Sequence, residues 1–454
     1  AMGSPGNCPA DRCLWEHVPT RGNRAGGTVS YAEFLKKKAE TVQPAGKEVH
    51  RESLPDLMHE WQKDLVIWAC QVGRAALWAD TGLGKTIMQC EWARQMGERS
   101  LIIAPLAVCH QTVREAAKIG ITARYLTADD GLPGVMVTNY ERVANFADVD
   151  AVVLDEASIL KQSDGATRTA LIEQFAGTPY RLACTATPAP NDVEELTNQA
   201  AFLGVSSRQN MLAAYFIHDS DGWRLKGHAR QPMFRWMSSW ATAVRKPSDL
   251  GYPDDGYDLP QLQIIPHLLP VEIAPEDQLF ATDLGGVGGR AKIRRDTLAV
   301  RVQRAVDLVM AEPDEPWLLW TGLNAEADAL AAALPGSVNI KGSMSAEEKA
   351  AGLLGFADGD IQILVTKPSM AAFGLNWQHC ARMAFVGLSD SYEAYYQSIR
   401  RCYRYGQTRE VHAHIVLSEL ESQIATNVAR KERQAQDVMA ELVTHMHNAK
   451  ELAS

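Results

Sequence analysis

Short runs of apolar and β-branched residues alternate with segments of helical periodicity along most of the chain. The runs in the first half lie at 75–79, 101–105, 135–140, 151–157 and 180–188, and those in the second half at 317–323, 337–342, 361–367, 382–388 and 411–417. Fully apolar strands interleaved with helices are typical of a parallel sheet that is covered on both faces. The pattern therefore predicts an α/β protein with two lobes.

The alternation stops at residues 206–250, which are basic, rich in tryptophan and predicted to be helical, and a turn-rich joint follows at 251–262. A chain of 454 residues exceeds the usual limit for one core, so several domains are expected. We predict a flexible N-terminal lead at 1–45, lobe one at 46–205, a basic Trp-rich helical insertion and joint at 206–255, and lobe two with a C-terminal helix at 256–454.

The composition is that of an ordinary globular protein, with 46% hydrophobic and 22% charged residues. No apolar run approaches the roughly 18 residues that cross a bilayer, so we expect no membrane partner. Eight cysteines in a chain of this length do not form a disulfide framework, and a reducing cytoplasm is expected. Cys8, Cys13 and His17 lack a fourth ligand, so zinc binding there stays open.

The sequence "ADTGLGKT" at 79–86 follows an apolar run and precedes a helical pattern. Gly82 and Gly84 would let backbone N–H groups approach phosphate oxygens at the N-terminus of that helix. Lys85 would reach the β and γ phosphates, and Thr86 would place a hydroxyl on Mg²⁺. Ala79 stands where the usual pattern opens with glycine. The alternative is a glycine turn that only leads into a helix.

A second motif, "AVVLDEAS" at 151–158, places two acids at the carboxyl end of a buried strand, where open α/β sheets bind ligands. Asp155 can hold Mg²⁺ through water, and Glu156 can orient and deprotonate the attacking water. The alternative is an Asp-Glu pair that merely ends a strand. The Asp-Glu pair lies about 70 residues after the glycine loop, and this spacing favours the interpretation that both motifs belong to one nucleotide site.

Two further motifs, "CTATPAPND" at 184–192 and "YYQSIRRCYRYGQ" at 395–407, complete an ordered set. With them the chain resembles the superfamily-two helicases, and more closely their Swi/Snf-type DNA translocases in a compact, phage-like form. The resemblance extends over roughly residues 50 to 420 and implies two RecA-like lobes, each a mostly parallel sheet covered by helices, with a helical insertion at the end of lobe one.

The resemblance also implies roles for individual residues. Arg401 and Arg404 occupy the arginine-finger positions, Gln62 the position of the adenine-reading glutamine, and Ser158 stands where His or Asp is familiar. Catalysis is assigned to Lys85, Asp155, Glu156, Arg401 and Arg404; nucleotide binding to Gln62, Thr81, Gly82, Leu83, Gly84, Lys85, Thr86, Gly374 and Gln407; Mg²⁺ to Thr86 and Asp155; and coupling to Thr185, Ala186 and Thr187.

Nucleic-acid contacts are predicted from two sources. The resemblance implies backbone contacts at Pro105, His110, Asn139 and Asn376. The segment 224–246 adds a concentrated positive patch to a chain of net charge −10, with Arg224, Lys226, Arg230 and Arg235 as candidate contacts and Phe234, Trp236 and Trp240 interleaved. The alternative is a helical element whose rings form core and whose cations are solvated.

The leading hypothesis is an ATP-dependent translocase on double-stranded DNA, with ATP and Mg²⁺ as cofactors. Fingers on one lobe and a phosphate loop on the other require lobe closure for hydrolysis, and closure moves a polymer that both lobes grip. The alternatives are a strand-separating DNA or RNA helicase and a nucleotide-gated scaffold that hydrolyses ATP slowly. The sequence does not indicate protein partners.

Overall fold

The computed structural model describes residues 42–161, 165–220, 222–270, 294–373, 376–389 and 391–451. Cys8, Cys13, His17 and nearly all of the predicted N-terminal lead lie outside these ranges. None of the helices in these ranges combines the length and the apolar character that a bilayer crossing requires.

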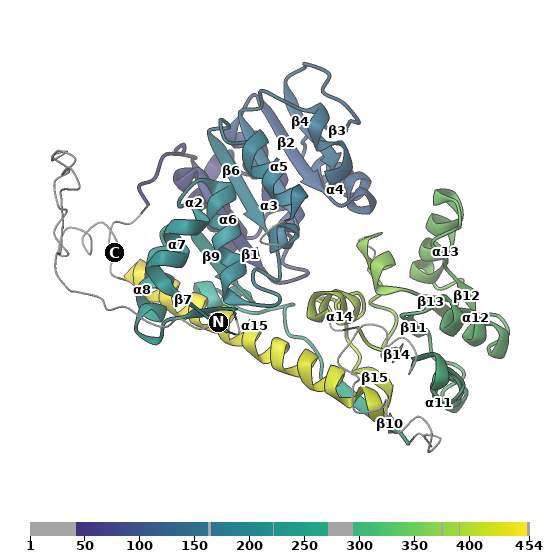
Figure 1. The fold of residues 1–454 in the computed structure, drawn as a ribbon. Coiled ribbons are helices and arrows are strands. Elements are labelled where there is room, and N and C mark those ends of the chain that lie inside the picture. Colours follow the sequence, from purple (N-terminus) through teal and green to yellow (C-terminus); the bar gives the residue numbers. More distant parts are fainter. Residues whose placement is uncertain are drawn as a thin grey trace, which may run out of the picture. The chain divides into compact units, whose positions relative to one another are not determined.

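The first sheet has seven strands in the order β3-β4-β2-β5-β6-β1-β9, and every neighbouring pair is parallel. Its strands are β1 (Arg74–Ala79), β2 (Arg99–Ala104), β3 (Ala123–Tyr125), β4 (Gly134–Asn139), β5 (Ala151–Asp155), β6 (Tyr180–Cys184) and β9 (Ala241–Val244). The helices that pack around it are α2 (Glu60–Val72), α3 (Lys85–Met96), α4 (Leu106–Lys118), α5 (Ala166–Gln174) and α6 (Leu196–Leu203) (Figure 1).

The segment after α6 is mixed in structure. It contains α7 (Arg208–Tyr215), an antiparallel hairpin of β7 (Phe216–Asp219) and β8 (Gly222–Leu225), and α8 (Arg230–Met237). The strand β9 then returns to the first sheet and pairs with β1 in parallel. Part of the segment that the sequence assigned to a helical insertion therefore belongs to the first lobe, while the predicted domain boundaries remain predictions.

The second sheet has six strands, again all parallel, in the order β10-β15-β14-β11-β13-β12. They are β10 (Leu262–Leu269), β11 (Trp317–Thr321), β12 (Val338–Asn339), β13 (Ile363–Thr366), β14 (Arg382–Val386) and β15 (Val411–Ser418). The surrounding helices are α11 (Leu298–Ala311), α12 (Asn324–Ala333), α13 (Ala346–Asp358) and α14 (Tyr392–Ile399).

Both faces of the second sheet are buried at its strand β11. Along β11, Leu318 and Trp320 belong to one hydrophobic cluster, whereas Trp317 and Leu319 belong to another. Since successive side chains of a strand point to opposite faces, the two clusters lie on the two sides of the sheet. This explains why β11 appears as an unbroken apolar run, and it confirms the predicted α/β fold with two mostly parallel sheets.

The last helix, α15 (Ser422–Glu451), belongs to both lobes (Figure 1). Near its start, Ile424 and Val428 lie in a core cluster of the second sheet. Farther along, four apolar side chains lie in the core of the first lobe, namely Val438, Met439, Leu442 and Val443. The helix predicted for the end of lobe two thus also completes the core of lobe one.

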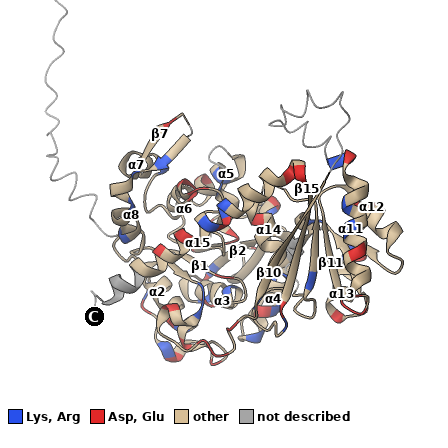
Figure 2. Cartoon of the chain, turned by 90° about the horizontal axis from the view of Figure 1, so that it is seen from below, with Lys and Arg blue, Asp and Glu red and all other residues tan. Residues whose placement is uncertain are grey.

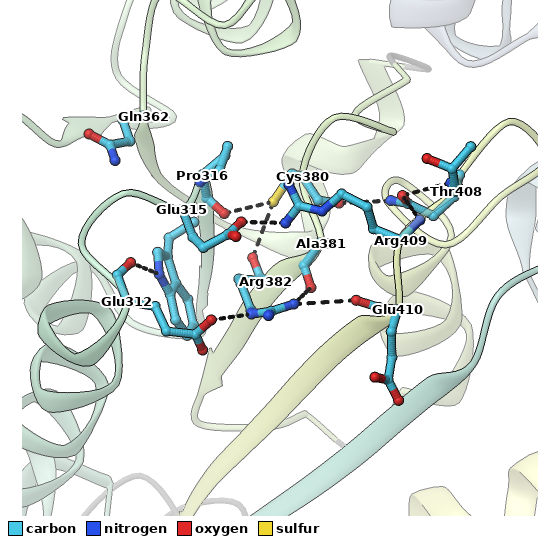
Figure 3. Close-up of polar contacts among 12 residues, drawn as sticks. Glu312, Glu315, Pro316, Gln362, Cys380, Ala381, Arg382, Thr408, Arg409 and Glu410 are labelled. Carbon is cyan, nitrogen blue, oxygen red and sulfur yellow. Dashed lines mark hydrogen bonds and ion pairs between the residues drawn. The ribbon is translucent and has the colours of Figure 1, made fainter.

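A set of polar contacts fixes the entrance to β14 (Figure 3). Arg382 donates from Nε to Glu312 at 2.8 Å and from Nη1 to the carbonyl of Glu410 at 3.3 Å, and Arg409 pairs with Glu315. The thiol of Cys380 donates to the carbonyl of Pro316 at 3.3 Å. These contacts join the segments that lead into β11, β14 and β15, so the chain that follows residue 407 is held against the sheet.

Candidate nucleotide and nucleic-acid sites

The loop between β1 and α3 has the backbone that a phosphate cradle needs. Gly82 and Gly84 have φ angles of 86° and 75°, a left-handed region that other residues avoid. A Cβ atom on Gly84 would lie 2.4 Å from Nε2 of Gln62. The Gln62 amide donates to the carbonyl of Leu83 at 3.0 Å, so it lies against the loop, as predicted for a residue that lines the nucleotide site.

Lys85 is the first residue of α3, whose N-terminus is open to an anion. Its Nζ donates to the carbonyls of Ala79 at 2.8 Å and Asp80 at 3.2 Å, which folds the side chain back over the loop. Thr81 donates its backbone N–H to the Asp80 carboxylate at 2.6 Å, and Thr86 is partly exposed in the first turn of α3. A phosphate group could therefore replace the two carbonyls as the partner of Lys85.

The two acids of the second motif lie at the carboxyl end of β5. Asp155 accepts from Nε2 of Gln89 at 2.8 Å, and the hydroxyl of Tyr140 donates to its backbone carbonyl at 2.5 Å. Burial raises the pKa of Asp155, against the opposing effects of Gln89 and Lys85. The Asp155 carboxylate is thus fixed beside the glycine loop, where it can take part in holding a cation.

Glu156 is set apart by its backbone and by its acidity. Its φ of 58° is unusual for a residue other than glycine, and such angles cluster at functional sites. Burial and the neighbouring Asp155 raise the pKa of Glu156 to about 7. A carboxylate with a pKa near neutrality is suited to accept a proton from water.

The predicted coupling residues lie next to Glu156. The hydroxyl of Thr185 donates to Oε2 of Glu156 at 3.4 Å and accepts the backbone N–H of Thr187 at 3.0 Å, with Ala186 between them. This stretch directly follows β6, so a shift of the end of this strand would change the contact between Thr185 and Glu156. The structure brings these residues to the acids, and their coupling role remains a prediction.

The predicted fingers come from the second lobe, and Arg401 lies close enough to Glu156 to interact with it electrostatically. Desolvation lowers the pKa of Arg401, and Glu156 opposes that change. Burial, Arg401 and Arg400 lower the pKa of Arg404 to about 10. Within the part of the chain that the structure describes, Nε of Arg401 and Nε of Arg404 are buried without a hydrogen-bond partner. Two buried Nε–H donors without an acceptor fit an anionic ligand.

A cleft of about 1410 Å³ opens beside these acids and is lined by both lobes. From the first lobe it takes Pro105, His110 and Glu156, and from the second lobe Asn376. Three of the predicted nucleic-acid contacts therefore share one surface with the predicted catalytic base. Asn139 is buried nearby and bonds to Tyr125 and Glu141 instead, although the next residue, Tyr140, lines the cleft.

The comparisons with known proteins agree with this geometry. A family model described as the SNF2-related domain matches residues 57–216, and one described as the helicase conserved C-terminal domain matches residues 309–406. The two matches follow one another and together span more than half of the chain. The chain belongs to the Swi/Snf-type superfamily-two helicases.

Among solved structures, this Swi/Snf-type chain is similar to the SWI2/SNF2 ATPase core of Sulfolobus solfataricus in complex with double-stranded DNA. The two share 18% sequence identity with a TM-score of 0.42, over 89% of this chain and 98% of the other. A search of curated proteins gave no match. The compact, phage-like form of the family stays a prediction.

Two of the family-derived nucleotide contacts need comment. Gln407 is buried, and its amide donates to the carbonyls of Gln378 at 2.8 Å and Cys380 at 3.1 Å, while its Oε1 accepts the backbone N–H groups of Thr408 and Arg409. In this Swi/Snf-type chain it therefore anchors the end of the finger segment, and its contact with nucleotide remains a prediction. Gly374 lies outside the described residues.

The basic segment of this Swi/Snf-type chain favours the alternative that the sequence left open. Phe234 and Trp240 are fully buried in the core of the first lobe. The cations are already engaged within the chain: Arg224 pairs with Asp219, Lys226 donates to the carbonyl of Ala213, and Arg230 pairs with Glu441. Contacts of these residues and of Arg235 with nucleic acid remain predictions.

Several site residues were missed by the sequence reasoning. Tyr140 and Gln89 hold Asp155, and Tyr405 lies over the phosphate loop, 2.7 Å from where a Cβ atom on Gly82 would be. Tyr140 directly follows Asn139 of a recognised motif, and Tyr405 directly follows Arg404, so proximity in the sequence was the available signal. Nothing local marks Gln89, which lies one turn into α3.

Proposed function

We propose that this chain is an ATP-dependent translocase on double-stranded DNA. The observation that carries the proposal is that Arg401 of lobe two interacts electrostatically with Glu156 of lobe one, while the Nε atoms of Arg401 and Arg404 are buried without a hydrogen-bond partner in the described part of the chain. The family membership supports ATP hydrolysis that depends on nucleic acid. The cleft lined by both lobes offers a place where a polymer could contact each of them.

The residues of the site fit Mg²⁺ and ATP. Lys85 would bind the β and γ phosphates, and Thr86 with Asp155 would hold the cation, which supplies charge neutralisation at the phosphates. Glu156 would orient the attacking water and accept its proton, since its pKa is near 7. Arg401 and Arg404 would stabilise the charge that develops in the transition state, an effect on the order of 10³-fold or more.

The preference for duplex DNA rests on the SNF2-related domain and on the ending "RYGQ" of the finger motif. Translocases of this type follow the backbone of an intact duplex, so we expect binding that is electrostatic and largely independent of sequence. Acidic and basic residues are interspersed over the molecule (Figure 2), so the contact surface must be local.

The deciding experiment is ATPase activity measured with duplex DNA, single-stranded DNA, RNA and no polymer. We expect duplex DNA to stimulate hydrolysis most, and ATP to drive displacement of a third strand from a triplex with little unwinding of a plain fork. Fork unwinding with a single-strand preference would favour a strand-separating helicase. Slow hydrolysis that no polymer stimulates would favour a nucleotide-gated scaffold.

A further inference from the structure

One carboxylate in the phosphate loop binds the second lobe directly. Oδ2 of Asp80 accepts from Nη2 of Arg400 at 2.8 Å, and its Oδ1 accepts from the hydroxyl of Tyr396. Only 16% of the Arg400 side chain and 14% of the Asp80 side chain are exposed. An ion pair that is largely shielded from water, with a second hydrogen bond to the same carboxylate, is stronger than a solvated surface pair.

The same helix is held at its other end. Glu393, in the first turn of α14, accepts from the hydroxyl of Ser158 at 2.5 Å and pairs with Lys161 of the first lobe. Ser158 is the residue of the second motif that departs from the familiar pattern. The helix α14 is therefore bonded to lobe one by its first turn and by the residues at its last turn, through residues of both nucleotide-binding motifs.

The fingers follow this helix immediately. Arg401 is adjacent to Arg400, and Arg404 lies three residues after Arg401. Burying the Nε atoms of Arg401 and Arg404 without acceptors is unfavourable, and three neighbouring cations also repel one another. The bonds that Asp80 and Glu393 form between the two lobes can offset this cost.

We propose that Arg400 and Tyr396, bound to Asp80, are positioning residues that hold the arginine-finger segment against the phosphate loop. This inference rests on the proposed ATPase function. Arg400 itself acts through Asp80 and through its stacking over Tyr396 and Tyr403, at 5.1 and 5.4 Å from the ring centres. Its loss should therefore affect the transition state, where the fingers act, more than the binding of nucleotide.

The first test separates turnover from affinity. Arg400→Gln should lower kcat by roughly tenfold to a hundredfold, the cost of a small misplacement of catalytic groups, while the Kd of a non-hydrolysable ATP analogue changes less than about twofold. Arg400→Lys should recover part of the lost kcat. The matched control is Arg409→Gln, which removes an ion pair within lobe two (Figure 3) and should leave both quantities unchanged. Equal changes in kcat and affinity, or no change, would overturn the proposal.

The second test asks whether Asp80 and Arg400 act together. In a cycle of Asp80→Asn, Arg400→Gln and the double variant, the double variant should be no slower than the slower single variant. Additive losses would show that the pair does not act as a unit and would contradict the proposal.

A third measurement does not depend on hydrolysis. Small-angle scattering of the nucleotide-free chain should show a larger radius of gyration for Arg400→Gln combined with Glu393→Gln than for the parent chain, because both links to lobe one are weakened. An unchanged radius would overturn the proposed positioning role of Arg400 and Tyr396 even if the parent chain hydrolyses ATP. If the parent chain does not hydrolyse ATP but the radius increases in the variant, the contact between the lobes is supported and the proposed function is wrong.

Discussion

Glu156 combines an uncommon backbone angle with a carboxyl group that is costly to ionise. Its φ is 58°, and burial with Asp155 raises its pKa to about 7. The same burial that makes the carboxylate a stronger base makes the folded protein less stable when the group is charged. The two effects can be measured separately.

The first prediction concerns the pH dependence of activity. A general base works when it is deprotonated, so polymer-stimulated kcat/KM should rise with pH and level off above about 7, the pKa of Glu156 in the free protein. The pH profile of kcat/KM at saturating polymer provides the measurement. A profile that is flat between pH 6 and 8 would remove Glu156 from the role of base.

The second prediction concerns stability. Because the folded-state pKa of Glu156 is raised above its ordinary value of 4.5, the carboxyl contributes stability at low pH that is lost as pH rises toward about 7. Glu156→Gln cannot ionise, so its Tm should exceed that of the parent chain by a few degrees at pH 8 and by much less at pH 5. The variant should also retain bound ATP without hydrolysing it. Equal Tm differences at the two pH values would contradict the assignment.

The third prediction concerns the phosphate loop. Lys85→Ala should abolish hydrolysis, because no other cation of α3 reaches the loop carbonyls that Lys85 contacts. Nucleotide binding and turnover in the purified variant provide the test, with Lys341→Ala, which removes a surface cation paired with Asp328 in lobe two, as the control. Near-normal turnover of Lys85→Ala would remove this loop from the active site.

At the scale of elements, the sequence predicted most strands of the two sheets and missed β3, β9 and β10. The run that became β5 is unmistakable, whereas β9 is only four residues long, in a basic and aromatic segment, and is stabilised by pairing with the distant β1. β10 contains Pro266, which argued against a strand, but it lies at the edge of the sheet, where proline is tolerated.

The residues of the candidate site could likewise be predicted where the local sequence has a recognisable pattern. The loop 79–86 and the acids after β5 have local signatures, so their residues could be named from the sequence. The contacts of Gln407 with Gln378 and of Arg400 with Asp80 could not be predicted, because the packing of the chain, and not the spacing along it, brings these partners together.

The fourth prediction tests whether α15 packs into the cores of both lobes. Leu442 is fully buried in the core of lobe one, so Leu442→Ala should lower the free energy of unfolding by about 2–5 kcal/mol. Hydrogen exchange should become faster in β9, against which α15 packs. Asp437→Ala, an exposed position on the same helix, is the control and should have little effect. Faster exchange in β15 alone would show that the helix serves only lobe two.

At the scale of the whole molecule, the net charge of −10 means that a polyanion must be bound by a local surface. Two surfaces compete for this role. One is the cleft, where Arg114 and Lys118 join the predicted contacts Pro105 and His110. The other is the basic segment, where Arg230 is already paired with Glu441.

The fifth prediction compares these surfaces. Arg114→Glu with Lys118→Glu should weaken duplex binding and reduce the slope of log affinity against log salt by about one for each phosphate group that the protein no longer binds. Arg230→Glu with Arg235→Glu is expected to weaken binding less, with basal ATPase retained in both variants. Titrations at several salt concentrations measure both slopes. A larger change from the second pair would favour the basic segment as the DNA surface.

The helix α15 also limits how the lobes can move. Its 30 residues form a rod of about 45 Å, with apolar side chains seated in one lobe near its start and in the other lobe farther along. Pulling the lobes apart along this rod, or turning one lobe about its axis, would move those buried side chains into water, which is unfavourable. Any motion of one lobe relative to the other would therefore have to bend the helix between the two sets of buried side chains.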